Sequence, residues 1–313
     1  MKAIRLMGIG FVVLALLGGS VYFVRRTLDR MQTPADSGLL YPTPAPPRTA
    51  QAAPVLLPEY IADTDARFAV HTSAAEFQLF LTMPDAYAHA RGLPYAQLYD
   101  LSTQYLLWDN ESPLPDECRI EDVPHISQNP ELPRGCEVTS LAMLLNHMGI
   151  PADKLTLAEQ VAKDDTPFAR VNGVTTFGNP NRGFVGSMTN LGENGLGVYH
   201  GPIFDLLRTY CPGAADMTGC DFDAVRYYLA KGRPVWVIVT SGFRVLPEHA
   251  FETWHTADGE IRVTYSEHSV LLTGYDARWV YFNDPLGGAS KAELASFVAA
   301  WEQMGGQAVS CAP

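Results

Sequence analysis

The chain has 313 residues, of which 47% are hydrophobic, and its formal net charge at pH 7 is −12. This hydrophobic content is ordinary for a globular protein and excludes a chain that is disordered throughout. The acidic charge, together with the lack of a Lys/Arg-rich block beyond the first thirty residues, argues against a nucleic-acid partner.

An uncharged apolar run occupies residues 7–24 and is long enough to be a membrane-span candidate. The small-residue site at residues 18–20 lies inside this run, which favours an uncleaved anchor over a cleaved signal. Positive charges flank the run on both sides, so charge alone leaves its orientation open. We therefore expect an N-terminal membrane anchor over residues 1–30.

Residues 31–58 are rich in proline, alanine and threonine, a composition typical of an extended, stiff linker. A linker between an anchor and a long remainder suits a domain held outside the cell. The expected location is thus the cell membrane, with a single-pass helix as the contact with the lipid and an extracytoplasmic domain. An Ala-rich segment at residues 49–53 leaves later processing of the linker open.

A small α/β appendage is expected over residues 59–115. Residues 67–72 alternate as in a strand, and two further short strands are expected over residues 95–99 and 104–108. Residues 74–83 have helical periodicity, which ends at a proline. The appendage has no recognisable catalytic pair, so we expect it to serve packing or partner binding.

A polar loop turns into an apolar helix at Cys136. Four poor helix formers precede this cysteine, and apolar residues then recur at intervals of three and four, namely Val138, Leu141, Ala142, Leu145 and Met148. The pattern predicts a helix from Cys136 to about Gly149. A helix N-terminus stabilises a thiolate and lowers the thiol pKa, which favours a nucleophile. The alternative is a buried cysteine that acts as a small hydrophobic residue.

The remainder, residues 118–313, is predicted to form one α+β domain. Residues 172–201 form a glycine-rich irregular region, in which Gly183, Phe184 and Gly186 are candidates for the wall of a substrate groove; the alternative is a structural loop. The other expected elements are helices over 155–163, 221–231 and 291–303 and strands over 234–240, 260–265, 269–275 and 279–283.

Three residues supply the partners that a thiol nucleophile needs. His268 begins an apolar strand and is the candidate general base. Asp284 ends the next strand, so the two side chains should come within reach, and Asp284 would orient the imidazole. Because neighbouring residues of a strand face opposite ways, only one of Asn283 and Asp284 can do so. Gln128 precedes the thiol by eight residues and is a candidate donor to an oxyanion hole.

The five cysteines contain no C-x-x-C pair and no Cys/His cluster at zinc-ligand spacing, so we expect neither a metal nor another cofactor. In an oxidising compartment, Cys211 with Cys220 and Cys118 with Cys311 are one hypothetical pairing, which leaves Cys136 reduced. The alternative is five reduced thiols.

The sequence resembles the C39-like cysteine peptidases, specifically the C39_2 group of the papain-like superfamily. The resemblance covers residues 122–309 and is carried by Q-x7-C-E at Gln128 to Glu137, by EHSVLLTGY and NDPLGG, and by NPNRGFVGSMTNLGENGLGVYHGPI. It implies a papain-like fold, with Cys136 as nucleophile, His268 as base, Asp284 as its orienter and Gln128 in the oxyanion hole. The chain departs from the D-C-G of bacteriocin-processing members, because Glu137 places a negative charge beside the thiol and opposes thiolate formation.

The expected function is hydrolysis of a peptide or related amide bond in a peptide or protein substrate, through a thioester acyl-enzyme. One alternative is a catalytically inactive binding module with the same fold at the cell envelope. Another is an acyl or peptidyl transferase, in which an amine replaces water at the thioester.

Overall fold

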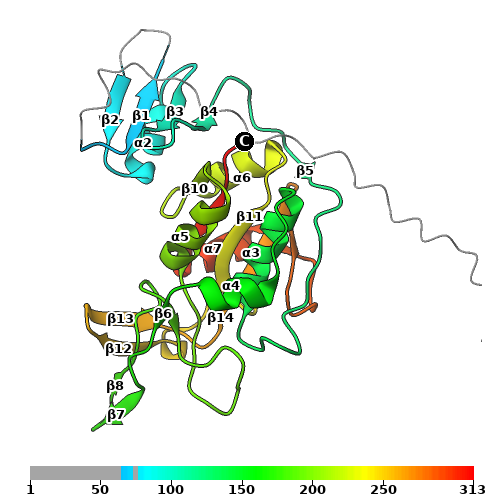
Figure 1. Cartoon of the computed structure of the whole chain (residues 1–313). Coiled ribbons are helices and arrows are strands. Elements are labelled where there is room, and N and C mark those ends of the chain that lie inside the picture. Colours follow the sequence, from blue (N-terminus) through cyan, green and yellow to red (C-terminus); the bar gives the residue numbers. More distant parts are fainter. Residues whose placement is uncertain (1–64, 73–76) are drawn as a thin grey trace, which may run out of the picture. The chain divides into compact units, whose positions relative to one another are not determined.

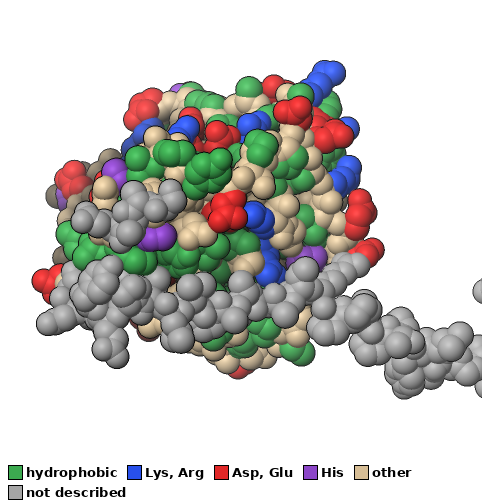
Figure 2. Space-filling view, turned by 90° about the horizontal axis from the view of Figure 1, so that it is seen from above, with side chains coloured by type: hydrophobic (Ala, Val, Ile, Leu, Met, Phe, Trp, Pro, Cys, Tyr) green, Lys and Arg blue, Asp and Glu red, His purple; other side chains and the backbone are tan. Residues whose placement is uncertain are grey.

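The structure is a computed structural model that describes residues 65–72 and 77–313 (Figure 1). The described residues belong to one compact unit. Acidic, basic and hydrophobic side chains are interspersed on the face shown in Figure 2.

The membrane assignment is corrected by the structure. No helix within the described ranges has both the length and the apolar character that crossing a membrane requires. The segment predicted as the anchor, residues 7–24, and the linker after it lie outside those ranges. The single-pass anchor, and the extracytoplasmic location derived from it, are therefore not supported.

The appendage is a four-stranded antiparallel sheet with one helix. The sheet has the order β2-β1-β3-β4, and its elements are β1 (Phe68–His71), β2 (Phe77–Phe80), α2 (Met83–Ala90), β3 (Gln97–Asp100) and β4 (Leu106–Asp109). The helix predicted over residues 74–83 is wrong at residues 77–80, which form β2. The helix begins at Met83 instead, because Thr82 caps it and Pro84 occupies its first turn, where a proline costs no hydrogen bond.

The centre of the main domain is a seven-stranded sheet whose paired strands are antiparallel. Its order is β10-β17-β11-β14-β15-β16, and β5 also pairs with β14. The strands are β5 (Cys118–Arg119), β10 (Ala214–Asp216), β11 (Val235–Thr240), β14 (Glu267–Tyr275), β15 (Trp279–Asn283), β16 (Lys291–Glu293) and β17 (Ala308–Cys311). All six residues of β11 are buried, as its continuous apolar run predicts.

Helices cover both faces of this sheet. On one face, α3 (Cys136–His147) packs on β11 and β14, with α4 (Lys154–Gln160) and α5 (His200–Tyr210) beside it. Trp236 and Leu271 point into the core of this face. On the other face, α6 (Phe222–Ala230) and α7 (Leu294–Gln303) pack on the sheet around Val237 and Val270. The expected α+β class is confirmed.

A second group of short strands forms from residues 163–185 and from the segment before β14. One sheet has the order β13-β12-β8-β7, and a separate parallel pair joins β6 to β9. The bounds are β6 (Lys163–Asp164), β7 (Ala169–Val171), β8 (Val174–Thr176), β9 (Phe184–Val185), β12 (Glu252–Thr256) and β13 (Gly259–Val263), with a 3-10 turn, η2 (Glu248–Ala250), before β12.

Candidate active site around Cys136 and His268

Cys136 is the first residue of α3, where the sequence predicted it. Its side chain is buried, with 7% exposure, and its thiol donates a hydrogen bond to Glu137 Oε2 at 3.3 Å. Burial raises the pKa of this thiol well above its ordinary value, and the charges of Glu137 and Glu267 add to that effect. A hydrogen bond from the Ser269 backbone acts in the opposite direction. The net environment favours the neutral thiol.

Glu137 and Glu267 place two carboxyl groups beside the thiol, and Glu267 as a residue is half-buried with its Oε1 atom buried. Glu137 is fully buried, and its Oε1 accepts a 2.7 Å bond from the Val198 backbone N–H. Burial raises the pKa of Glu137 to about 7, and burial with the neighbouring Glu137 charge raises that of Glu267. One ligand-type atom from each of Cys136, Glu137 and Glu267 lies within 4.8 Å of the other two, and within the described residues this is the group that could hold a metal ion.

Sequence reasoning missed Glu267. The available signal was its place in the Glu-His-Ser run at the start of β14, because strand alternation puts Glu267 and Ser269 on the face opposite to His268. That face carries α3. A buried carboxyl group was therefore predictable there, but the helix that it meets was not identified from the sequence.

His268 and Asp284 are brought together in the structure. His268 Nε2 lies 2.8 Å from Asp284 Oδ1, and both residues are at most 4% exposed. Burial alone raises the pKa of Asp284, but the bond and charge of His268 outweigh it, so the pKa is lowered. Asn283 faces elsewhere, since its Nδ2 donates to the carbonyl oxygens of Val123 and Pro124. Of the two neighbours, it is Asp284 that contacts the imidazole.

The thiol and the imidazole lie on either side of the beginning of β14. His268 is opposite Val239 in the β11–β14 register and shares its face with Val270, in the core of α6 and α7. Cys136 instead belongs to α3 on the other face. Among the described residues, no hydrogen bond joins the Cys136 thiol to the His268 ring, although the thiol contacts the backbone of Ser269, the next residue along β14.

Gln128 joins the loop before α3 to the segment after Asp284 through a backbone hydrogen bond. Its backbone N–H donates to the Pro285 oxygen at 2.9 Å, and its Nε2 donates to the Pro133 oxygen at 2.9 Å. The side-chain amide donor is therefore engaged within the loop and does not contact Cys136 in this structure.

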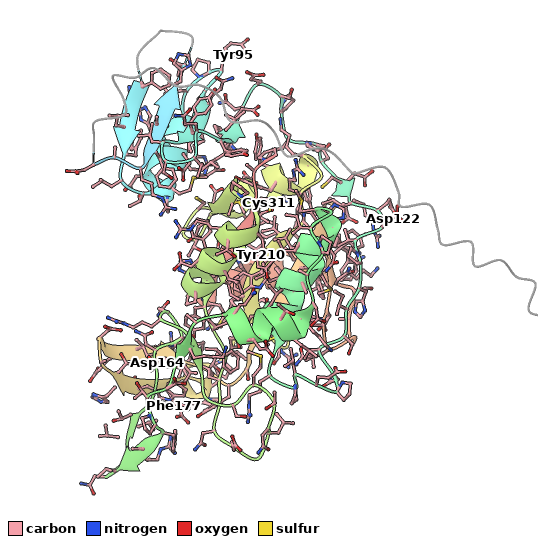
Figure 3. The ribbon with its side chains drawn as sticks, in the orientation of Figure 1. Tyr95, Asp122, Asp164, Phe177, Tyr210 and Cys311 are labelled. Carbon is pink, nitrogen blue, oxygen red and sulfur yellow. The ribbon has the colours of Figure 1, made fainter. Side chains whose placement is uncertain are left out.

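The three glycine-rich candidates occupy different environments. Gly183 packs against the backbone of residues 162–164, and Phe184 is buried with 1% exposure. Gly186 lines a cavity of about 460 Å³, whose other walls include acidic and aromatic side chains; Asp164 and Phe177 of this cavity are labelled in Figure 3. The groove wall stays a prediction, and Gly186 is the candidate with access to a cavity.

Arg134 holds the glycine-rich region next to the start of α3. Its guanidinium donates to four backbone oxygens, those of Ser187, Asn190, Leu191 and Glu193, at 2.7 to 3.3 Å. Because Arg134 lies two residues before Cys136, the loop and the thiol are positioned by the same segment.

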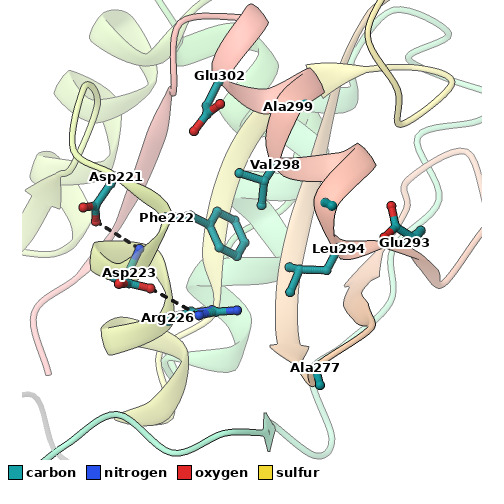
Figure 4. A pocket seen from close by; sticks show the side chains of 11 residues that line it. Asp221, Phe222, Asp223, Arg226, Ala277, Glu293, Leu294, Val298, Ala299 and Glu302 are labelled. Atoms are coloured by element: carbon teal, nitrogen blue, oxygen red, sulfur yellow. Dashed lines mark hydrogen bonds and ion pairs between the residues drawn. The ribbon is translucent and has the colours of Figure 1, made fainter.

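Another cavity, of about 490 Å³, lies between α6 and α7 (Figure 4). Its wall includes Phe222 and Arg226 from α6 and Leu294 and Val298 from α7. These helices cover the sheet face opposite to α3, so this cavity is not part of the Cys136 site.

The α+β domain has a cysteine at a helix N-terminus and a histidine–aspartate pair on the adjoining sheet, as the resemblance to the C39-like peptidases implies. The family model of the Peptidase_C39 like family matches residues 120–309, and the chain belongs to this family. The chain is 50% identical over 182 residues to the uncharacterized protein YvpB of Bacillus subtilis (strain 168), covering 58% of this chain and 70% of YvpB.

Comparison with a solved structure also indicates the C39-like family. The chain is similar, with a TM-score of 0.59 and 44% identity, to the crystal structure of a C39-like peptidase candidate from Bacillus anthracis. The similarity covers 64% of this chain and 98% of that chain. The expected family is thereby confirmed.

Proposed function

We propose that this chain is a cysteine peptidase that cleaves a peptide or related amide bond in a peptide or protein substrate. Cys136 attacks the carbonyl carbon, the amine leaves with a proton from His268, and a thioester remains on the sulfur. Water activated by His268 then releases the acid and regenerates the thiol. Asp284 orients His268. The Cys136 backbone N–H stabilises the oxyanion, together with the Gln128 amide once it has left the Pro133 oxygen.

The observation that carries the proposal is the His268–Asp284 pair at the start of β14, one residue from the backbone that contacts the Cys136 thiol. The position of Cys136 at the N-terminus of α3 adds to it, because the helix dipole favours a thiolate there. Family membership supports a peptidase rather than an unrelated use of these residues.

Activation of the thiol requires a change in the arrangement described here. The Cys136 hydrogen must leave Glu137 and the negative charge of Glu137 must be removed or moved away. The thiol and the imidazole must also come together at the start of β14, because they lie on its opposite sides. Since burial raises the pKa of Glu137, protonation of this carboxyl group is one such change near neutral pH.

A binding module with the same fold is the second candidate. It is favoured by the thiol pKa, which burial and the two carboxylates raise, and by the bond from the thiol to Glu137. In this alternative Cys136 is a structural residue, and His268 and Asp284 stabilise the start of β14.

The test is the rate of iodoacetamide alkylation of Cys136 in the 313-residue chain between about pH 5 and pH 10, together with hydrolysis of a peptide library. A peptidase is expected to hydrolyse some peptides, and His268→Ala should lower that rate by about 100-fold or more. Glu137→Gln removes a negative charge beside the sulfur, so alkylation should become about tenfold faster at about pH 8.5, where nearly all Glu137 carboxyl groups of the parent are ionised. Cys118→Ser, which removes a partly exposed thiol, is the control for labelling elsewhere.

The same experiment can also rule out the peptidase. If the library is not cleaved, and if Cys136 is alkylated no faster than an ordinary thiol of pKa about 8.5 in both the parent and the His268→Ala chain, the hydrolase is ruled out. The binding module then takes its place.

A further inference from the structure

Two cysteines outside the candidate site lie against each other. Cys211 caps the C-terminus of α5, and Cys311 is the final residue of β17. Both side chains have 0% exposure and belong to the core that α3 covers. The Cys311 thiol is in hydrogen-bond contact with the Cys211 thiol. This contact joins segments that are about 100 residues apart in the sequence.

The backbone on both sides of the thiols is held in place by hydrogen bonds. In the antiparallel pairing of β10 with β17, Ala214 is opposite Cys311. The Ala214 N–H donates to the Cys211 oxygen at 3.0 Å, and the Ala312 N–H donates to the Gly213 oxygen at 2.7 Å. Figure 3 labels Tyr210, next to Cys211, and Cys311. The close approach of two main chains is what a disulfide requires, since its Cα atoms are usually less than about 7 Å apart.

We propose that Cys211 and Cys311 form an intramolecular disulfide that ties the end of α5 to β17. This pairing differs from the one expected from the sequence, in which Cys211 pairs with Cys220 and Cys311 with Cys118. Cys220 packs in the core on the other side of the sheet, and Cys118 lies on β5 beside Tyr275. All five cysteines are thiols in the structure, so the bond would form by oxidation.

The oxidant is a disulfide of the glutathione class. The thiolate of one cysteine attacks a sulfur of oxidised glutathione, which breaks its S–S bond and releases one glutathione thiolate. The second cysteine then attacks the protein sulfur of the mixed disulfide and releases the other glutathione. Two electrons pass from the cysteines to the oxidant, and their two protons end on the two glutathione thiols.

The location of the pair determines when the bond can form. Contact with Cys211, and then burial, raise the pKa of the Cys311 thiol well above its ordinary value, and the nearby Arg233 charge only partly offsets this. A neutral thiol that solvent does not reach reacts slowly with a disulfide. The bond is therefore expected to form during folding, before β17 is enclosed between β10 and β11.

The test is to unfold the 313-residue chain and refold it in a buffer of oxidised and reduced glutathione, and then to map the cross-links by proteolysis and mass spectrometry without reduction. A peptide that joins Cys211 to Cys311, lighter by two hydrogens than the sum of its parts, is expected. Because the bond closes a loop of about 100 residues, the midpoint of thermal unfolding should be higher than in the reduced chain by on the order of 10 °C.

Cysteine variants and a reductant test whether the cross-link and the higher melting midpoint come from the Cys211–Cys311 disulfide. Cys211→Ser and Cys311→Ser should each abolish the cross-link, whereas Cys118→Ser should retain it. Comparison of the parent chain with and without reductant requires no substitution in the core, so a variant that fails to fold does not stop the test. The proposal would be overturned if Cys211 and Cys311 of the oxidatively refolded chain were fully alkylated in denaturant without reductant, if the cross-link involved Cys118 or Cys220, or if the melting midpoints were equal.

Discussion

The Glu137 carboxyl group lies against the Cys136 sulfur, and its protonation therefore sets the charge that the sulfur experiences. The second carboxyl group, Glu267, comes from a strand more than a hundred residues later. Burial raises the pKa values of both carboxyl groups, and the charge of Glu137 raises that of Glu267 further. The reactivity of the Cys136 thiol is therefore expected to depend on the protonation of these two carboxyl groups as well as on His268.

Stability should depend on pH through Glu137. Its pKa is 4.5 ordinarily and about 7 in the folded protein, so the folded state binds a proton more tightly than the unfolded state between these values. The free energy of unfolding should then fall as pH rises from about 4.5 to about 7, by on the order of 3 kcal/mol. Urea unfolding at several pH values measures this decrease. Glu137→Gln should make it smaller, and the part that remains comes from Glu267, whose pKa is also raised.

Glu302, exposed on α7, provides the control for this measurement. Glu302→Gln should leave the pH dependence as it is in the parent chain. The same decrease in stability in Glu137→Gln as in the parent would contradict the assignment to Glu137.

At the scale of elements, the segment between β9 and α5 encloses the carboxyl pair. Gly197 passes so close to it that a side chain has no room, because an added Cβ would overlap Glu137 Oε1 and lie 2.8 Å from Glu267 Oε2. The glycine is thus needed for close approach rather than for an unusual backbone angle. This is one physical reason for a glycine in a region that the sequence suggested as a substrate wall.

Gly197→Ala is expected to lower the free energy of unfolding by about 1–3 kcal/mol, because the buried carboxyl groups must move to admit the methyl group. Chemical denaturation measures the loss. Gly201→Ala is the matched control, since the nearest atom to its added Cβ is the Asn181 oxygen at 3.4 Å, an ordinary contact. Equal free energies of unfolding of the two variants would contradict this prediction, because they would show that the segment admits the methyl group without loss of stability.

The sequence predicted the elements with strong patterns and missed those whose signals conflict. The helix at Cys136 and strands β11, β14 and β15 have clear apolar periods or runs. The helix α5 was missed because Gly201 and Pro202 suggested a loop, although both lie in its first turn, where proline is tolerated. Strands β10 and β17 are too short to produce a pattern of their own, with three and four residues.

In the candidate site, too, the contacts that follow from local sequence patterns were predicted and those between distant segments were not. The proximity of His268 and Asp284 followed from two adjacent antiparallel strands joined by a tight turn, which is local information. The surroundings of the thiol could not be obtained in this way, because Glu267 and Val198 come from distant segments. The interaction of Glu137 with Cys136 was visible in the sequence as a neighbouring charge, but its complete burial was not.

At the scale of the whole described unit, the appendage is attached to α6 by polar contacts. Tyr227 donates a 2.7 Å hydrogen bond from its hydroxyl to Asp109 Oδ2, and Lys231 Nζ lies 3.2 Å from the same oxygen. Burial alone raises the pKa of Asp109, but these two bonds outweigh it and the pKa is lowered. The contribution of Asp109 to stability is therefore present at neutral pH and lost as pH falls through the lowered pKa.

Asp109→Asn should reduce the free energy of unfolding at pH 7 by about 1–2 kcal/mol, because Tyr227 and Lys231 lose a charged acceptor. The difference from the parent should begin to shrink below about pH 4, where the unfolded parent takes up the proton. It should continue to shrink as pH falls through the lowered pKa of Asp109, where the folded parent also becomes neutral. Urea denaturation at the two pH values is the measurement, with the exposed Asp116→Asn as control. A difference that does not change with pH would contradict the role of the charge.

The place of β17 in the sheet has a consequence for the order of events during synthesis. This strand lies between β10 and β11, although it is made about 70 residues after β11 and 90 after β10. Until β17 is made, β10 and β11 each have an unpaired edge. The residues of β11 are all apolar apart from Thr240, so its unpaired edge can pair with other chains. The main sheet therefore cannot close progressively as the chain grows, and we expect a nascent chain that depends on late, long-range pairing to fold slowly and to need protection from aggregation.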